Sequence, residues 1–356
     1  MVSLLEVLKL SCNKKASDVH ITVGSPPVLR IDGELFKLDT KPLVSEDTKN
    51  MCYSLISDEQ KARFENEKHL DFSFFVKGLT RFRGTLFYQN AAVSGAFRTL
   101  HSEPPEIQGL DLPSAIENAI YYPFGLVLIT GPTGSGKSTT LAAIIDAINE
   151  TRRGHILTLE DPIEIVHSHK KCIVNQREIG ADCHSFTDGM KNALRADPDI
   201  CLVGEMRDPE TIELALKLAE TGHLVFSTLH TNSAGKTVDR IVSSFPASER
   251  DIICNQLSTV LQAVISQRLL KTKTGGRRVA TEILFANAAI RNLIRENKIF
   301  QIYSVIQTNF NEGMCTMNQS LLKLIEEGVV EAKDAFNVSS EKEELYQLLK
   351  KKKLAG

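Results

Sequence analysis

Residues 125–139 have the sequence GLVLITGPTGSGKST, in which an apolar run leads directly into a glycine-rich loop. The run from Leu126 to Ile129 is continuous and partly β-branched, as expected of a strand that is buried on both faces. Residues 131–138 then fit the pattern G-x-x-x-x-G-K-[ST]. Apolar residues recur behind the loop at helical spacing, at positions 141, 144, 145 and 148. The stretch therefore predicts a strand, a loop and a helix, in the order that a nucleotide-binding phosphate loop requires.

The chemistry of this loop follows from its residue types. Glycines allow successive backbone N–H groups to surround a phosphate, and the following helix adds the positive end of its dipole. Lys137 is expected to reach the β- and γ-phosphates of ATP, and the Ser138 hydroxyl is expected to ligate Mg²⁺. A chance glycine-rich turn is the alternative, and the correct flanking strand and helix argue against it. The nucleotide is expected to contact Gly131, Pro132, Thr133, Gly134, Ser135, Gly136, Lys137, Ser138 and Thr139.

The composition excludes several other classes of protein. With 356 residues the chain has room for two or three domains of about 150 residues. Its formal net charge of −2 gives no general attraction to nucleic acid or to anionic membranes, so no nucleic-acid partner is expected. No signal-peptide pattern occurs and no apolar run approaches the roughly 18 residues of a membrane span, which predicts no direct membrane insertion. The seven cysteines include no C-x-x-C pair, so we expect neither zinc nor disulfides and a reducing, cytoplasmic setting.

The first hundred residues predict a mixed α+β domain. Ser3 and Glu6 have the spacing of a capping box at the start of a helix. Apolar and polar residues alternate in 18–23, which indicates a half-buried strand, and Asp32 with Gly33 indicates a hairpin between two strands. Two helices are expected around 45–56 and 58–68.

Three arginines lie on neighbouring strands predicted at the end of this domain. The period of two places Arg81 and Arg83 on one face, opposite the apolar Phe82, and Arg98 belongs to the next strand. Arginines clustered in this way suit the phosphates of a bound nucleotide. From the spacing alone, the plainer alternative is favoured, which is a solvated strand face with surface salt bridges.

Further polar residues follow predicted strands of the nucleotide domain. In HILTLEDPIEIV a strand ends in Glu160, Asp161 and Glu164, where open α/β sheets place ligand-binding groups. In DICLVGEMRD the apolar strand is followed by Glu205. This is the position of the acid that completes the Mg²⁺ site in P-loop NTPases. In HLVFSTLHT the strand ends at His230, which is either a γ-phosphate sensor or a structural histidine.

These features divide the chain into four parts. We expect an α+β domain over 1–100, a proline-containing linker over 101–115, a RecA-like nucleotide-binding core over 116–270, and a mainly helical region over 271–356. The predicted fold class is therefore α/β, with a P-loop ATPase core flanked by an N-terminal α+β domain and a helical C-terminal region.

Taken together, the motifs resemble the secretion and pilus superfamily of hexameric P-loop ATPases, and within it the type IV pilus retraction motors. The resemblance covers nearly the whole chain and rests on GPTGSGKST, LEDPIE, LVGEMRD, TGHLVFSTLHT and AIRNLIRENK. It implies a PAS-like N-terminal domain and a homohexameric ring. Superfamily members that extend pili or drive secretion usually carry a longer N-terminal region and a four-cysteine zinc element, so a chain that starts at the PAS-like domain without paired cysteines is more similar to retraction motors.

The resemblance also implies roles for individual residues. Glu164 corresponds to the catalytic base, Glu205 supports the metal site with Ser138, and His230 senses the nucleotide. Arg81, Arg83 and Arg98 match the arginines that assist catalysis. The implied partners are other copies of the chain, an inner-membrane platform protein and, indirectly, pilin, at the inner face of the cytoplasmic membrane. The alternatives are an assembly or secretion motor, or a nucleotide-gated regulator of a sister motor. Cys183, next to His184, is a candidate reactive thiol without further support.

Overall fold

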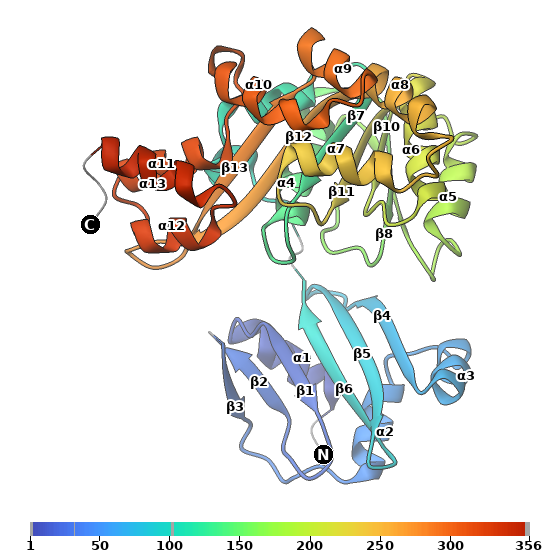
Figure 1. The fold of residues 1–356 in the computed structure, drawn as a ribbon. Coiled ribbons are helices and arrows are strands. Elements are labelled where there is room, and N and C mark those ends of the chain that lie inside the picture. Colours follow the sequence, from blue (N-terminus) through green and yellow to red (C-terminus); the bar gives the residue numbers. More distant parts are fainter. Residues whose placement is uncertain (1–2, 32, 101–102, 353–356) are drawn as a thin grey trace. The chain divides into compact units, whose positions relative to one another are not determined.

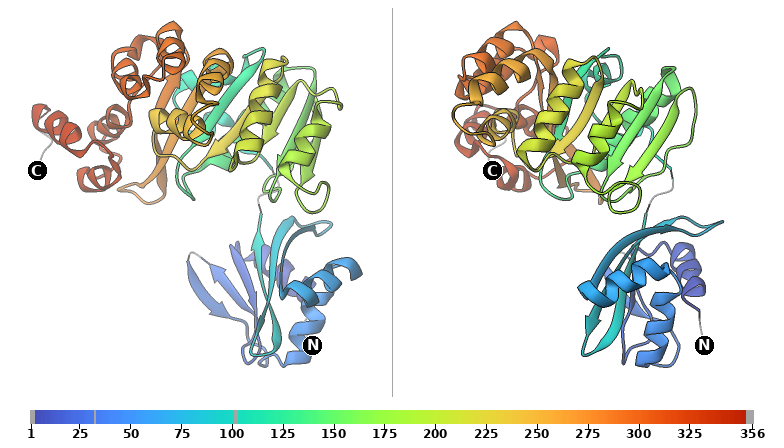
Figure 2. Two further views of the ribbon diagram at one scale, coloured as in Figure 1. Left: turned by 45° about the vertical axis from the view of Figure 1, so that its right-hand side comes forward. Right: turned by 90° about the vertical axis from the view of Figure 1, so that its right-hand side faces the viewer.

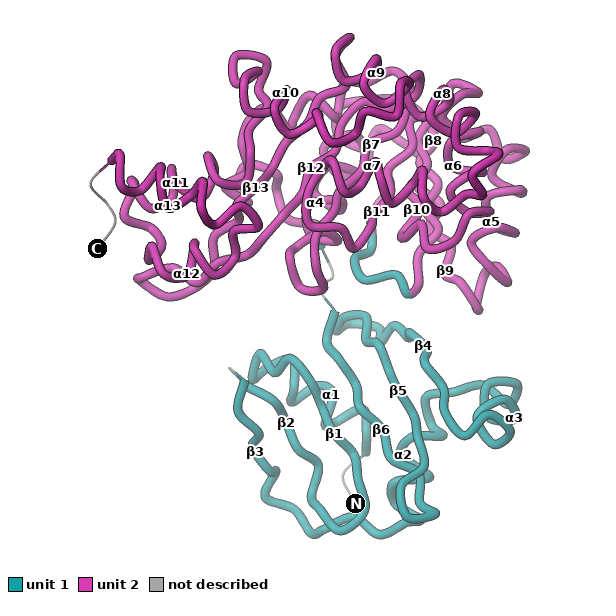
Figure 3. The backbone as a smooth tube through the Cα atoms, viewed as in Figure 1, with its two compact units in different colours: residues 1–103, 162–166 teal, residues 104–161, 167–356 magenta. Residues whose placement is uncertain are grey.

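Two β-sheets organise the chain, and each belongs to its own unit (Figure 3). Unit 1 comprises residues 1–103 and 162–166, and unit 2 comprises residues 104–161 and 167–356. The computed structural model describes residues 3–31, 33–100 and 103–352. Within these ranges, no helix combines the length and the apolar character needed to span a membrane.

Unit 1 contains a six-stranded antiparallel sheet in the order β3-β2-β1-β6-β5-β4 (Figure 1). Its strands are β1 (Asp18–Ile21), β2 (Val28–Ile31), β3 (Glu34–Lys37), β4 (His69–Phe75), β5 (Arg81–Gln89) and β6 (Ala92–Thr99), and its helices are α1 (Leu4–Asn13), α2 (Ser45–Tyr53) and α3 (Asp58–Glu67). The predicted capping box of Ser3 and Glu6 is confirmed. The predicted hairpin joins β2 to β3, although Asp32 itself lies outside the described residues.

One face of this sheet forms the core of unit 1. Phe82 and Phe97 from the sheet and Phe64 from α3 are each 0% exposed in this core, together with apolar side chains of α1 and α2. The alternation predicted for β5 is confirmed, since Phe82, Gly84 and Leu86 are buried and the residues between them are not. The predicted arginine face therefore points away from the core.

Unit 2 is built on a seven-stranded sheet in the order β13-β12-β7-β11-β10-β8-β9. All neighbours are parallel except the antiparallel pair β12 and β13. The strands are β7 (Gly125–Thr130), β8 (His155–Glu160), β9 (Ile173–Glu178), β10 (Ile200–Val203), β11 (Leu224–Leu229), β12 (Leu261–Lys271) and β13 (Arg277–Phe285). All six residues of β7 are buried, which confirms the predicted central strand.

Helices cover both faces of this sheet (Figure 2). On one face α4 (Lys137–Thr151) packs with the short 3₁₀ helices η1 (Ile107–Leu110) and η2 (Ser114–Ile120). The other face is covered by α5 (Phe186–Ala193), α6 (Pro209–Glu220), α7 (Ala234–Ser243) and α8 (Arg250–Val260). This is the doubly covered parallel sheet predicted for the nucleotide-binding core.

Two boundaries differ from the expected ones. The sheet does not stop at 270, because Gly275 and Gly276 adopt positive φ angles of 91° and 87° and turn the chain back into β13. The stretch expected to be a linker contains η1, where Ile107 is buried in the core of unit 2. Residues 101–102 of that stretch lie outside the described residues.

The C-terminal region is helical after β13, as predicted. It contains α9 (Ala288–Arg295), η3 (Ile299–Gln301), α10 (Ile302–Thr308), η4 (Phe310–Glu312), α11 (Met317–Glu326), α12 (Ala332–Val338) and α13 (Lys342–Lys351). The apolar face of α9 packs into the main core, where Ile290 and Ile294 are both 0% exposed.

Arg291 of α9 holds the end of α8. Its guanidinium donates to the carbonyl oxygens of Ser258 and Thr259, at 2.8 and 2.7 Å, and to Oε1 of Gln262 at 3.2 Å. The two carbonyls belong to the last turn of α8, where a cation is favoured by the helix dipole. Arg295, one turn further along α9, is exposed.

We expect Arg291→Met to destabilise the protein and Arg295→Met to leave it nearly unchanged. The methionine keeps an apolar stem but loses the three hydrogen bonds, and charged hydrogen bonds each contribute about 1.5–3 kcal/mol. Thermal and denaturant unfolding of the two purified variants measures the difference. Equal stability of both variants would show that the contacts of Arg291 contribute nothing net.

Candidate functional site

The phosphate loop connects β7 to α4, as predicted, and its backbone requires glycine. Gly131, Gly134 and Gly136 have positive φ angles of 145°, 77° and 91°. A Cβ at Gly131 would lie 2.5 Å from both the carbonyl oxygen of Gln267 and Oγ of Ser135. The loop is therefore held in its conformation by close contacts with β12 and with itself.

The loop fits a phosphate group in three respects. Ser135 is 3% exposed, and its Oγ has no hydrogen-bond partner among the described residues. Gly136 occupies the N-cap of α4 and has no side chain to satisfy the N–H groups of the first turn. Lys137 Nζ donates to the carbonyl oxygens of Gly131 and Pro132, at 2.9 and 3.2 Å, so its charge lies against the loop. Donors and positive charge thus converge where a phosphate is expected.

The polar residues predicted after the strands lie at one edge of the sheet. The strands β7, β11, β10 and β8 are consecutive and parallel, so their carboxyl ends share an edge. This edge carries the phosphate loop, His230, Glu205 and Glu160 in that order. Open α/β sheets bind ligands at this edge.

Glu205 and His230 are in direct contact. His230 Nε2 lies 3.3 Å from Oε1 of Glu205, and Nε of Arg207 lies 2.9 Å from the other carboxylate oxygen. The Glu205 side chain is 19% exposed, so both of its oxygens are oriented by neighbours while the group stays accessible. Arg207 was not singled out from the sequence, although it stands two residues after Glu205 in the same motif. The three side chains form an oriented acid flanked by two basic groups.

Glu164 belongs to the segment 162–166, which is grouped with unit 1 (Figure 3). Burial alternates along this segment, because Ile163 and Ile165 are 5% and 9% exposed while Glu164 is exposed between them. The two isoleucines therefore anchor the segment and leave the carboxylate available. The structure thus assigns Glu164 and the three arginines to unit 1, and the phosphate loop, Glu205 and His230 to unit 2.

The arginines form a row across the sheet of unit 1. Arg83 of β5 stands directly opposite Arg98 of β6, and Arg98 stands opposite Asp18 of β1. Arg98 Nε donates to Asp18 Oδ1 at 2.9 Å, and Arg30 lies 3.8 Å from the same carboxylate. Like charges directly opposite each other destabilise a sheet. Asp18 is the one acid in a row with Arg30, Arg83 and Arg98, so the row has an excess of positive charge, which suits an anionic ligand.

Arg81 and Arg83 have different surroundings. Arg81 Nε donates to Ser73 Oγ at 3.1 Å. The backbone of Arg83 pairs with β4 and β6, but its side chain has no hydrogen bond or ion pair within the residues that the structure describes. The surface salt bridge that was the plainer alternative is thus present for Arg98 but not for Arg83.

The surroundings of Cys183 disfavour a reactive thiol. It is 8% exposed, its Sγ approaches the carbonyl oxygen of Glu178 at 3.9 Å, and burial raises the pKa of the thiol. Since only the thiolate is a strong nucleophile, the residue serves the core of unit 2.

Replacing Lys137 by alanine should weaken binding of a nucleoside triphosphate by about 10- to 100-fold, because one charged hydrogen bond contributes about 1.5–3 kcal/mol. Titration with a fluorescent ATP analogue measures the affinity. Lys191→Ala is the matched control, since Lys191 pairs with Glu210 at the surface, where both side chains are 59% exposed. Unchanged affinity in Lys137→Ala would contradict the assignment of the phosphate loop.

Comparison with known proteins agrees with this geometry. Residues 97–276 match the family model described as "Type II/IV secretion system protein". The chain is 48% identical to the type IV pilus retraction ATPase PilT of Pseudomonas aeruginosa, over 94% of this chain and 97% of that protein. It is 49% identical to a twitching motility protein of Neisseria gonorrhoeae, over 92% of this chain and 88% of that protein.

A solved structure leads to the same family. The pilus retraction motor PilT with bound ADP superposes with a TM-score of 0.93, at 49% identity, over 98% of this chain and all of the solved one. The α/β fold class with a helical C-terminal region is thereby confirmed. The chain belongs to the type II/IV secretion system protein family and, within it, to the pilus retraction ATPases.

Proposed function

We propose that this chain is the ATP-hydrolysing subunit of a homohexameric ring that retracts type IV pili. The observation that carries the proposal is the shared sheet edge of unit 2, where the phosphate loop, Glu205 and His230 come together. Membership of the retraction ATPase family supports it, as does the ADP in the related structure. The ring would act at the cytoplasmic face of the inner membrane, on a platform protein directly and on pilin indirectly.

The residues of the loop have distinct roles in this proposal. Lys137, the N–H groups of residues 131–139 and the start of α4 bind the β- and γ-phosphates. Ser138 would hold Mg²⁺, with Glu205 acting directly or through water, and the ion when bound would neutralise charge on the phosphates. The contacts of Arg207 and His230 with Glu205 fix the direction of its carboxylate. His230 would thereby report the state of the nucleotide.

Hydrolysis itself would use a carboxylate and the arginines. Glu164 would accept a proton from the attacking water, since its carboxylate is exposed and a carboxylate can serve as a general base. The arginines of unit 1 would stabilise the charge that develops on the transferred phosphoryl group.

Glu164→Gln should bind ATP normally and lose at least about 100-fold in turnover, because the amide keeps the shape but cannot accept a proton. Phosphate release by purified protein measures turnover, and ATP-analogue binding measures affinity. Glu205→Gln is the comparison. If that variant alone loses turnover with normal binding while Glu164→Gln stays active, Glu205 and not Glu164 is the base.

Arg83→Ala should lower kcat by roughly a thousandfold with a much smaller change in nucleotide affinity, since the charge it meets develops in the transition state. Arg83→Lys should recover little, because the planar guanidinium is lost. Arg63→Ala on α3 is the control, since Arg63 forms only an exposed pair with Glu67. Normal turnover in Arg83→Ala would contradict a catalytic role and support the alternative, in which Arg83 belongs to a solvated strand face.

A further inference from the structure

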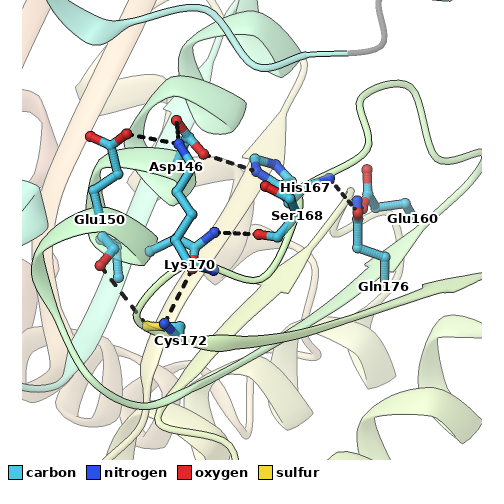
Figure 4. Close-up of polar contacts among 10 residues, drawn as sticks. Asp146, Glu150, Glu160, His167, Ser168, Lys170, Cys172 and Gln176 are labelled. Atoms are coloured by element: carbon cyan, nitrogen blue, oxygen red, sulfur yellow. Dashed lines mark hydrogen bonds and ion pairs between the residues drawn. The ribbon is translucent and has the colours of Figure 1, made fainter.

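The segment that carries Glu164 lies between Asp161 and His167 of unit 2, and a single side chain joins Glu160, just before the segment, to His167. Gln176 of β9 accepts a hydrogen bond from the backbone N–H of His167 at 2.7 Å through Oε1. Its Nε2 donates to Oε1 of Glu160 at 3.0 Å, and Thr158 donates to the same oxygen at 2.6 Å. Figure 4 shows Gln176 beside Glu160 with its contact to the backbone of residue 167. The exit and the return of the segment are thereby tied together.

Helix α4 holds the chain that follows the return point. Asn149, which is 0% exposed, accepts from the backbone N–H groups of Lys170 and Cys172 at 3.1 and 3.2 Å. Its Nδ2 donates to the carbonyl oxygen of Ser168 at 2.7 Å. Three backbone groups of an irregular segment are thus satisfied by one buried amide.

Charged groups of α4 reinforce this hold (Figure 4). Lys170 Nζ lies 2.8 Å from Oδ2 of Asp146 and 2.8 Å from Oε1 of Glu150. These hydrogen bonds raise the pKa of Lys170, so its charge is retained. His167, whose side chain is 5% exposed, faces Asp146 at 3.9 Å, and burial lowers its pKa. Asp146 is 7% exposed, so loss of Lys170 would leave a buried carboxylate without its main partner.

Chain length restricts how far Glu164 can lie from these anchors. Glu164 is four positions after Glu160 and three positions before His167, and a fully extended residue spans at most about 3.6 Å. The Cα of Glu164 therefore stays within about 14 Å of the Cα of Glu160 and about 11 Å of the Cα of His167. Helix α4 begins with Lys137 and Ser138 and contains Asp146 and Asn149 near its end. The same helix therefore carries the predicted phosphate-binding residues and two of the residues that hold the chain after His167.

We propose that Gln176, Asn149 and Asp146 with Lys170 are positioning residues for Glu164, because they fix the two ends of the segment that carries it. This inference rests on the proposed role of Glu164 as the base. A displacement of about 1 Å in a reacting group costs about 100-fold in rate. The positioning residues therefore affect the rate of the chemical step, whereas nucleotide affinity depends on the phosphate loop.

Gln176→Leu tests the proposal, since leucine has a similar size and forms no hydrogen bonds. We expect kcat to fall at least tenfold, and the affinity for an ATP analogue to stay within about twofold of the original, because the phosphate loop is untouched. An unchanged kcat, or an equal loss of affinity and kcat, overturns the proposal.

A double-mutant cycle separates this inference from the role of Glu164. If Gln176 acts through Glu164, Gln176→Leu should lower residual phosphate release no further in a Glu164→Gln background. An equal loss in both backgrounds shows a general structural effect and overturns the inference. Full turnover of Glu164→Gln alone would instead overturn the proposed function, on which the inference rests.

Lys170 supplies a second variant at a partly exposed position. Lys170→Met should lower kcat more than tenfold with normal analogue binding, and Lys170→Arg should recover most of it by pairing with Asp146 again. Lys191→Met, at the exposed pair with Glu210, is the matched control and should change neither quantity. A Lys170→Met protein with a lower unfolding temperature and an unchanged kcat would reduce this pair to a structural role and contradict the proposal.

Discussion

The parallel pairing of β7 with β11, β10 and β8 is the constraint on which the functional edge of unit 2 depends. Parallel neighbours end at the same edge of the sheet. Residues that are about a hundred positions apart in the sequence, such as Lys137 and His230, therefore lie at one edge. All six residues of β7 are buried, and each of them pairs with a residue of β11 in one continuous register. The contact of His230 with Glu205 is a direct product of that pairing, since each follows one of two adjacent strands.

Much of this arrangement was predictable from sequence, because the signals are local. The strand, loop and helix around Lys137 follow from an apolar run, three glycines and helical spacing, and the structure confirms all three elements. The outward face of β5 follows from a period of two. β13 was missed because the region was assigned by its later helical pattern, although Gly275 and Gly276 gave a hairpin signal.

Long-range polar contacts were not predictable in the same way. Gln176 contacts Glu160 and His167, and Asn149 contacts residues about twenty positions away. No periodicity marks such residues, because a single amide or carboxylate in a strand or helix looks like any other polar residue. Arg291 is similar, since its guanidinium contacts carbonyl oxygens at the end of α8, more than thirty positions earlier in the chain. Only the fold brings donor and acceptor together.

The choice of polar anchors over apolar packing has a physical reason. Residues 167–172 follow no regular secondary structure, so their N–H and C=O groups need partners that a sheet or helix would otherwise supply. A leucine in place of Asn149 would leave three of those groups unsatisfied, at a cost of about 1–3 kcal/mol each, and a leucine in place of Asp146 would remove a partner of the Lys170 ammonium. Hydrogen bonds also depend on direction, whereas apolar contacts tolerate sliding. A segment that must present one carboxylate at a defined place is therefore better held by an amide and an ion pair than by a larger core.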